Sequence, residues 1–404
     1  MKPIIVLTHC KVIIIFAILI LGGCTGVDVR FEPTLGTSAT QNGGTVEPTK
    51  IPSSTIVLSS TPEATPMPTP RPPVWESQES EFRANEVFTL LFDRQEGLWV
   101  GGADGLTNWD VQTGLHTSYV YNTAQGGHKA FVTASVQLPD GSLWFSTFGK
   151  GILRREPDGE WVNYTTQEGL PSDYISNLVV STDGTLWLDT SPYRLDQDRV
   201  DMGHFGRLDG GNWVPAVWGG FNQLIAGDAN DFWGLKIFQI GQFFDDNISY
   251  YNGENWQSRN IPEKSNTVTA IGMAPDGTLW AGTKDEVFYY KDETWQKLIP
   301  PWSGQIQSDV STIHVTPEGE VWFGFSTGML LSVTCGGPDF GSQELGIYRY
   351  DGQTWEHFTT EDGLAQNKIC TITSGPDGSI WAGTYDQGIS RYDGSTWTTY
   401  QVEE

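Results

Sequence analysis

The chain has 404 residues, of which 23 are lysine or arginine and 49 are aspartate or glutamate, so the formal net charge at pH 7 is −26. A surface of this charge repels phosphate backbones, which excludes nucleic acid as an expected partner. The sequence also contains 17 tryptophans. Most of them recur at fixed positions of a repeated phrase, which indicates a structural use.

The N-terminus predicts a lipoprotein signal peptide over residues 1–23. Lys2 and Lys11 are basic, and Val12–Leu21 is an apolar run that is short for a membrane span and typical of a signal-peptide core. The motif "LGGC" follows and resembles the bacterial lipobox, which implies that Cys24 receives lipid. An uncleaved membrane anchor is the alternative. Both interpretations place the rest of the chain outside the cytoplasm on a membrane tether.

Residues 24–74 are expected to comprise the lipidated cysteine and a disordered stalk. The segment is rich in threonine, proline and serine and has few large apolar side chains. Such a composition cannot bury enough surface to order the chain.

Residues 75–404 carry an internal repeat. Similar phrases such as "PDGSLW", "PDGTLW" and "PDGSIW" recur, and most of the intervals between them are about 42–47 residues. A period of this size is typical of propeller blades or helical arrays. The anchoring tryptophans are Trp99, Trp144, Trp187, Trp233, Trp280, Trp322 and Trp381.

The last unit predicts four short strands. "ICTITS", "SIWAGT", "ISRY" and "TWTTY" are separated by turn residues, including "PDG" and "YDG". Glycine in these turns adopts positive φ, and short strands at this spacing form an antiparallel meander. No unit shows the 3.6-residue period of a helix. The fold class is therefore all-β, a seven-bladed β-propeller of four-stranded antiparallel blades.

The repeat resembles the two-component regulator propeller family. The residues that match its pattern in the last unit are Ile369, Ile372, Gly378, Trp381, Gly383, Thr384, Gly388, Ile389 and Tyr392. In its best-known setting, this family implies an extracytoplasmic sensor of a membrane histidine kinase that responds to polysaccharide fragments. No kinase or DNA-binding segment follows Glu404, so free-standing propeller lipoproteins are the closer resemblance.

The strand order predicts two unlike faces. The tight "PDG" and "YDG" turns join first to second and third to fourth strands, so they share one face. The opposite face receives three insertions, at Ser191–His204, Phe238–Asn247 and Ser326–Leu345. Insertions confined to one face of a repeat protein often mark the binding face.

Aromatic side chains on the inserted face, with nearby polar groups, suit sugar rings, which have an apolar face and polar edges. Packing of these aromatics against the scaffold is the alternative for each of them. The residues expected to contact a ligand are Tyr193, Arg194, Trp218, Phe243, Trp302, Phe340, Tyr385 and Asp386.

No catalytic residue, metal site or cofactor is predicted. The histidines lack metal-ligand spacing, and His314 sits where packing is expected. Asp196, Asp198 and Asp201 loosely resemble a calcium loop but lack its glycine. A disulfide between Cys335 and Cys370 is compatible with the fold and the compartment, and a buried free Cys370 is the alternative.

The expected function is that of a membrane-tethered, extracytoplasmic propeller that binds a glycan or peptide as a sensor-like or accessory binding protein. A scaffold for a partner protein is the first alternative, and a propeller lyase or hydrolase is the second. We expect a monomer anchored through lipid.

Overall fold

The computed structural model describes residues 75–78, 86–103, 105–121, 131–191, 203–209, 211–227, 231–236, 238–239, 242–243, 248–262, 267–304, 309–326 and 345–400. All of them belong to the larger of two units in the chain, Ala64–Glu404. Within these ranges the helical elements are two short 3-10 turns, Thr166–Glu168 and Thr360–Asp362. None of the described helices is long and apolar enough to cross a membrane.

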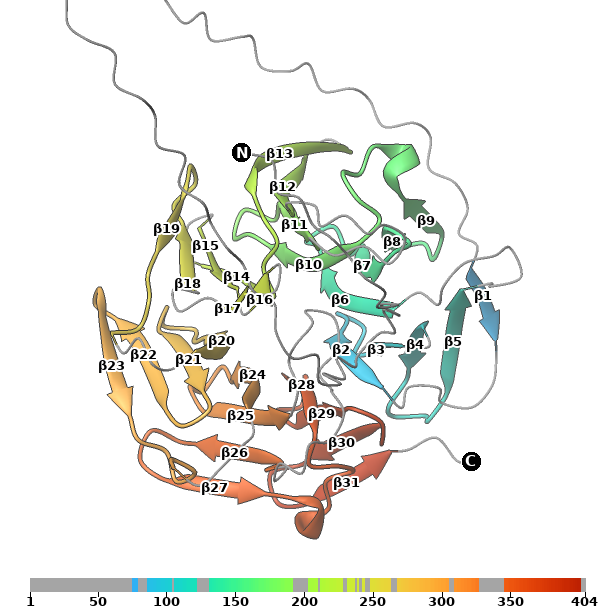
Figure 1. The fold of residues 1–404 in the computed structure, drawn as a ribbon. Coiled ribbons are helices and arrows are strands. Elements are labelled where there is room, and N and C mark those ends of the chain that lie inside the picture. Colours follow the sequence, from blue (N-terminus) through green and yellow to red (C-terminus); the bar gives the residue numbers. More distant parts are fainter. Residues whose placement is uncertain are drawn as a thin grey trace, which may run out of the picture. The chain divides into compact units, whose positions relative to one another are not determined.

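The unit is a seven-bladed β-propeller with four antiparallel strands in each blade, as the repeat predicts (Figure 1). Each blade is a meander, so its strands lie in chain order from the inside of the ring to the outside. The inner strands of blades 1 to 7 are β2 (Val87–Phe92), β6 (Phe131–Gln137), β10 (Ile175–Val180), β14 (Gln223–Ala226), β20 (Val268–Met273), β24 (Asp309–Val315) and β28 (Ile369–Ser374).

The second, third and outer strands complete the same pattern. The second strands are β3 (Leu98–Gly102), β7 (Leu143–Phe148), β11 (Leu186–Thr190), β15 (Phe232–Leu235), β21 (Leu279–Thr283), β25 (Val321–Ser326) and β29 (Ile380–Thr384). The third strands are β4 (Gly105–Trp109), β8 (Ile152–Arg155), β12 (His204–Asp209), β18 (Ile248–Tyr251), β22 (Val287–Lys291), β26 (Ile347–Tyr350) and β30 (Ile389–Tyr392). The outer strands are β5 (His116–Tyr121), β9 (Trp161–Tyr164), β13 (Asn212–Trp218), β19 (Trp256–Ser258), β23 (Thr294–Leu298), β27 (Trp355–Phe358) and β31 (Trp397–Tyr400).

The ring closes through side-chain packing between blades 7 and 1. The inner strand β2 contacts both β6 and β28, so the seven inner strands form a closed circle. Trp381 of blade 7 packs edge-on against Phe92 and Trp109 of blade 1, with ring centroids 5.6 and 5.7 Å apart. Both blades take their four strands from their own repeat, so closure needs no exchanged strand.

An additional strand, β1 (Trp75–Gln78), extends blade 1. It pairs antiparallel with β5, the outer strand of that blade. The structure places it on the rim of blade 1, where it adds a fifth strand and forms no pairing with blade 7.

The recurring phrase builds a hydrogen-bond chain under the first-to-second turn of blades 7 and 2. In blade 7 the indole N–H of Trp381 donates to Ser379 Oγ at 2.8 Å, and that hydroxyl donates to Asp377 Oδ1. Blade 2 repeats the arrangement with Trp144 and Ser142. Trp381 is 1% exposed, so a partner for its N–H removes the cost of a buried unsatisfied donor.

Glycine after the tryptophan lets the next blade approach. A Cβ on Gly383 would lie 2.4 Å from a methyl group of Val87, and one on Gly282 would lie 2.8 Å from Val310. Side chains at these two positions would therefore collide with the inner strand of the following blade. Glycine at these two positions therefore permits the close approach of the following blade.

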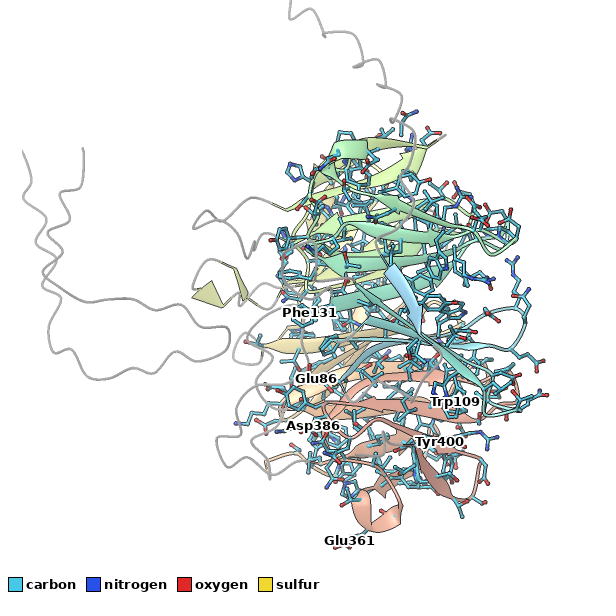
Figure 2. All side chains as sticks on the ribbon, turned by 90° about the vertical axis from the view of Figure 1, so that its right-hand side faces the viewer. Glu86, Trp109, Phe131, Glu361, Asp386 and Tyr400 are labelled. Carbon is cyan, nitrogen blue, oxygen red and sulfur yellow. The ribbon has the colours of Figure 1, made fainter. Side chains whose placement is uncertain are left out.

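The two faces of the ring differ as the strand order predicts. We call the side with the first-to-second and third-to-fourth connections the turn face, and the opposite side the loop face. Figure 2 shows Glu86, Phe131 and Asp386 toward the loop face and Trp109 toward the turn face. The short hairpin β16 (Phe238–Gln239) and β17 (Gln242–Phe243) of blade 4 projects from the loop face (Figure 2).

Candidate functional site

The predicted ligand residues fall into three groups. Tyr193, Arg194 and Phe340 lie outside the described residues, as do Cys24, Cys335 and the aspartates of the loose calcium motif. Trp218 ends β13 and Phe243 ends β17, so both backbones belong to the loop face. Tyr385, Asp386 and Trp302 are described in full.

Trp302 is a core residue, which corrects the expectation that it contacts a ligand. Its side chain is 1% exposed, and its ring lies 4.7 Å from Tyr348 and 4.9 Å from Phe325. The preceding prolines form a turn in which Ser303 N donates to Pro300 O. This turn directs the indole into blade 6, where apolar burial is favourable.

Tyr385 and Asp386 lie in the second-to-third loop of blade 7. The Lys368 ammonium lies 5.4 Å from the centroid of the Tyr385 ring, and the Lys368 carbonyl accepts a hydrogen bond from Tyr385 N. Asp386 is exposed, and its N–H donates to the Gln366 side chain at 3.2 Å. An aromatic ring, a carboxylate and an amide therefore meet on the loop face, in a combination suited to a polar ligand with an apolar surface.

Cys370 is the second residue of β28, two positions after Lys368. It is disulfide-bonded, which excludes the alternative of a free thiol. Its partner lies outside the described residues, so the pairing with Cys335 stays a prediction.

Blade 3 breaks the repeat at Asp189. This residue opposes Asn177 in the β10–β11 ladder, as Gly383 opposes Thr371 in blade 7. The phrase "LWLDT" thus carries an aspartate where "IWAGT" carries the packing glycine. At the buried junction between blades 3 and 4, an aspartate side chain therefore stands where other blades have a glycine.

The Asp189 carboxylate fastens the connection between these two blades. It accepts hydrogen bonds from Gly220 N at 2.8 Å, Phe221 N at 2.7 Å and Ser176 Oγ at 3.1 Å. The side chain is 0% exposed. Burial raises the pKa of Asp189 to about 7, although the three hydrogen bonds and Lys236 favour the ionised form.

Lys236 is the cation of this junction. It directly follows β15, and its ammonium lies 4.5 Å from the centroid of the Phe221 ring. Burial lowers its pKa, and Asp189 opposes this effect. The junction thus combines a buried carboxylate, a half-buried ammonium and an aromatic ring at the loop face. In the sequence, Asp189 and Lys236 each come just before one of the inserted segments.

Two further junctions pair a lysine with a partly buried carboxylate. Burial raises the pKa of Asp309, the first residue of β24, and nearby Lys284 of blade 5 acts against this. Burial also raises the pKa of Asp173, which accepts Thr166 N at 2.6 Å and is coupled to Lys150. These lysines lie in second-to-third loops, so the loop face repeatedly brings ammonium groups close to buried carboxylates.

His314 is part of the scaffold. Its Nε2 lies 2.7 Å from Ser374 Oγ, which joins the inner strands of blades 6 and 7. Burial lowers the pKa of His314 to about 4, so its ring is neutral at physiological pH. Across the described ranges no group of three or more His, Cys, Asp or Glu side chains is arranged to hold a metal ion.

Sequence reasoning missed the blade 3–4 junction. Asp189 was detectable, because it is the one charged residue at a position that is glycine in four blades, serine in blade 2 and leucine in blade 4. Lys236 carries no such signal, since blade 4 has the most degenerate repeat. Its place beside Phe221 follows only from how the two blades pack.

Comparison with known proteins supports the fold. No family model matches the chain, and no curated protein does. Many solved structures match it. One is the extracellular domain of BT4673 from B. thetaiotaomicron, with a TM-score of 0.56 and 16% identity over 79% of this chain. The match covers 40% of that structure's chain.

Two other similar structures are covered almost completely. Virginiamycin B lyase from Staphylococcus aureus matches 81% of this chain and 100% of its own, with a TM-score of 0.56 and 14% identity. YCF48 bound to D1 peptide matches 83% of this chain and 99% of its own, with a TM-score of 0.55 and 16% identity. At these identities the likeness establishes a shared propeller fold and leaves function to the site itself.

Proposed function

We propose that this protein is a membrane-tethered extracytoplasmic propeller whose loop face binds a glycan or peptide, in a sensor-like or accessory role. Cys24 carries the lipid, and residues 24–74 form the stalk. Tyr385 and Asp386 contact the ligand together with Tyr193, Arg194, Trp218, Phe243 and Phe340.

One observation carries the proposal. Asp173, Asp189 and Asp309 keep carboxylates at buried junctions of the loop face, where burial raises their pKa values. Burying ionisable groups costs stability, and groups perturbed in this way concentrate at functional sites. On the turn face the direction is reversed. The pKa values of turn aspartates such as Asp276 and Asp351 are lowered by hydrogen bonds.

Known propellers make both parts of the proposal reasonable. The BT4673 match is an extracellular domain, and the YCF48 structure holds a peptide. A scaffold for a partner protein fits less well, because the exposed large hydrophobic residues of the described surface are only Leu115 and Ile299. Two separate side chains do not form the apolar patch typical of such a surface.

Tethering is tested by Cys24→Ala. Without the acceptor thiol the protein should leave the membrane fraction and become soluble, because a lipid chain anchors only when it is attached. Fractionation of cells followed by immunoblotting measures the change. A variant that stays with the membrane would contradict the lipoprotein assignment.

Binding is tested with the soluble Cys24→Ala protein on a glycan and peptide array, followed by calorimetry of each hit. Tyr385→Ala should weaken a bound ligand by about 1–3 kcal/mol if this ring stacks on it. Tyr289→Ala is the matched control, since Tyr289 lies on β22 and its hydroxyl bonds Gln296. Equal affinity of wild type and Tyr385→Ala would contradict the assignment of this ring to the ligand site.

A further inference from the structure

We propose that Lys236, at the junction of blades 3 and 4, binds a carboxylate group of the ligand. This inference rests on the proposed function and identifies the chemistry of one subsite on the same face. The subsite consists of the Lys236 ammonium, the Phe221 ring below it and the connection that Asp189 fastens.

The Lys236 ammonium has unused donors. A lysine ammonium can donate three hydrogen bonds. Among the described residues its contacts are the Phe221 ring at 4.5 Å and electrostatic coupling to Asp189, with no hydrogen bond or ion pair. The side chain is half-buried at the end of β15, so ordering has already removed much of its rotamer freedom.

Asp189 positions the subsite while its hydrogen bonds go to groups other than Lys236. Its two oxygens are occupied by Gly220 N, Phe221 N and Ser176 Oγ. These bonds fix the backbone that carries Phe221, and the Phe221 ring in turn supports the ammonium. Asp189 also opposes the lowering of the Lys236 pKa by burial, which favours the charged ammonium that an anion would bind.

The structure favours a single carboxylate over a polyanion. The chain has a net charge of −26, which repels ligands with many sulfate or phosphate groups. Lysine presents a compact point charge, which suits a single carboxylate without requiring the bidentate geometry of arginine. The carboxylate can belong to a uronic acid or to a peptide C-terminus, and the test separates these sources.

Four probes distinguish them in calorimetric titrations of the full chain with Cys24→Ala. One pair is galacturonic acid and its methyl ester, which share one sugar ring and carry a charged and a neutral carboxyl group. The other pair is N-acetylated trialanine with a free or an amidated C-terminus. The proteins are Lys236→Gln, Lys236→Arg, and Lys284→Gln as a matched loop-face lysine control.

We expect wild type to prefer one acid over its neutral partner by about 10- to 100-fold, the range of a charge-assisted hydrogen bond. Lys236→Gln should abolish this preference, while Lys236→Arg and Lys284→Gln should retain most of it. Thermal unfolding of each variant shows whether it remains folded.

Competitive acetylation followed by mass spectrometry provides a second readout. Lys236 should react at a lower pH than Lys291 and should be protected by the preferred acid. This measurement needs no variant, so misfolding of Lys236→Gln leaves the inference testable.

Three results would overturn it. If neutral probes bind and Tyr385→Ala weakens them while Lys236→Gln changes nothing, the loop face binds a ligand but this subsite is wrong. If acid and neutral partners bind equally, the charge is irrelevant. If none of the four probes binds or protects Lys236, the carboxylate assignment falls, and the array then decides the proposed function separately.

Discussion

The pKa values of aspartates are shifted in opposite directions on the two faces of the ring. On the turn face, hydrogen bonds lower the pKa values of Asp276, Asp351 and Asp393 to about 2. On the loop face, burial raises the pKa of Asp189 to about 7 and also raises the pKa values of Asp173 and Asp309. Ionised aspartate therefore stabilises the turn face, whereas burial makes the ionised form unfavourable on the loop face.

Local geometry explains the turn face. A turn aspartate accepts N–H groups two or three residues later, as Asp393 does from Ser395 and Thr396. Cations of the third strand add ion pairs, such as Lys291 with Asp276 at 2.7 Å and Arg391 with Asp377 at 2.6 Å. These turn aspartates have structural partners, so the fold explains why they recur.

The loop face shows a different balance. Asp189 occupies a position that a glycine would fill without charge burial, and Lys236 beside it has no ion-pair partner among the described residues. Positions that break a local rule without a gain in stability are candidates for function. The groups with a purely structural role therefore lie on the turn face, and the proposed site lies on the loop face of the same repeat.

The largest effect should come from the packing that both faces share. Trp381→Ala should lower the free energy of unfolding by about 3–5 kcal/mol, because it empties the junction between blades 7 and 1. Chemical denaturation followed by tryptophan fluorescence and circular dichroism measures this. Tyr385→Ala in the same blade is the control and should change stability little. A smaller loss for Trp381→Ala than for Tyr385→Ala would contradict the division between scaffold and site.

Asp189 should make the protein less stable as the pH rises. Its pKa is 3.8 in the unfolded chain and about 7 in the folded protein, so the folded state binds the proton more tightly in this window. The stabilisation is complete below pH about 4 and is lost as the pH approaches 7, by about 1.4 kcal/mol per pH unit. Denaturation of wild type and Asp189→Asn at several pH values measures it, because asparagine cannot ionise.

The difference in unfolding free energy between wild type and Asp189→Asn should therefore shrink or change sign from pH 4 to pH 7. A difference that grows in favour of wild type over that range would show that the three hydrogen bonds outweigh burial. Asp189 would then resemble the turn-face aspartates.

The fold could be predicted from the sequence, and the candidate site could be predicted only in part. Trp381, Gly383 and the "PDG" turns act locally or at a fixed repeat distance, so their roles follow from the period. Trp302 was misjudged because its burial depends on how one interblade turn folds onto blade 6. Lys236 was missed because its neighbour Phe221 belongs to the preceding connection, and no periodic signal links the two.

Removing the hydroxyl under a buried indole should have an intermediate effect. Ser379→Ala deprives Trp381 Nε1 of its partner and should cost about 1–3 kcal/mol of stability. Blade 6 supplies a natural comparison, since Glu320 replaces the serine there and Trp322 Nε1 has no hydrogen-bond partner. Thermal unfolding of Ser379→Ala measures the loss. A stability equal to wild type would show that the hydrogen-bond chain does not contribute to the turn face.

The smallest effect should come from the exposed ion pair of blade 5, and its sign should oppose that of Asp189. The Lys291 ammonium and the groups of Thr278 lower the pKa of Asp276 to about 2, so its stabilisation is present above pH about 4 and is lost as the pH falls toward 2. Both side chains are about half exposed, at 48% and 54%, so Asp276→Asn should cost less than about 1 kcal/mol at pH 7. Salt should reduce this cost further, because it screens exposed charges. Denaturation at pH 7 and pH 3, in low and high salt, measures both dependences. If the cost of Asp276→Asn instead grew as the pH fell, the two faces would share one electrostatic behaviour, and the contrast that points to the loop face would disappear.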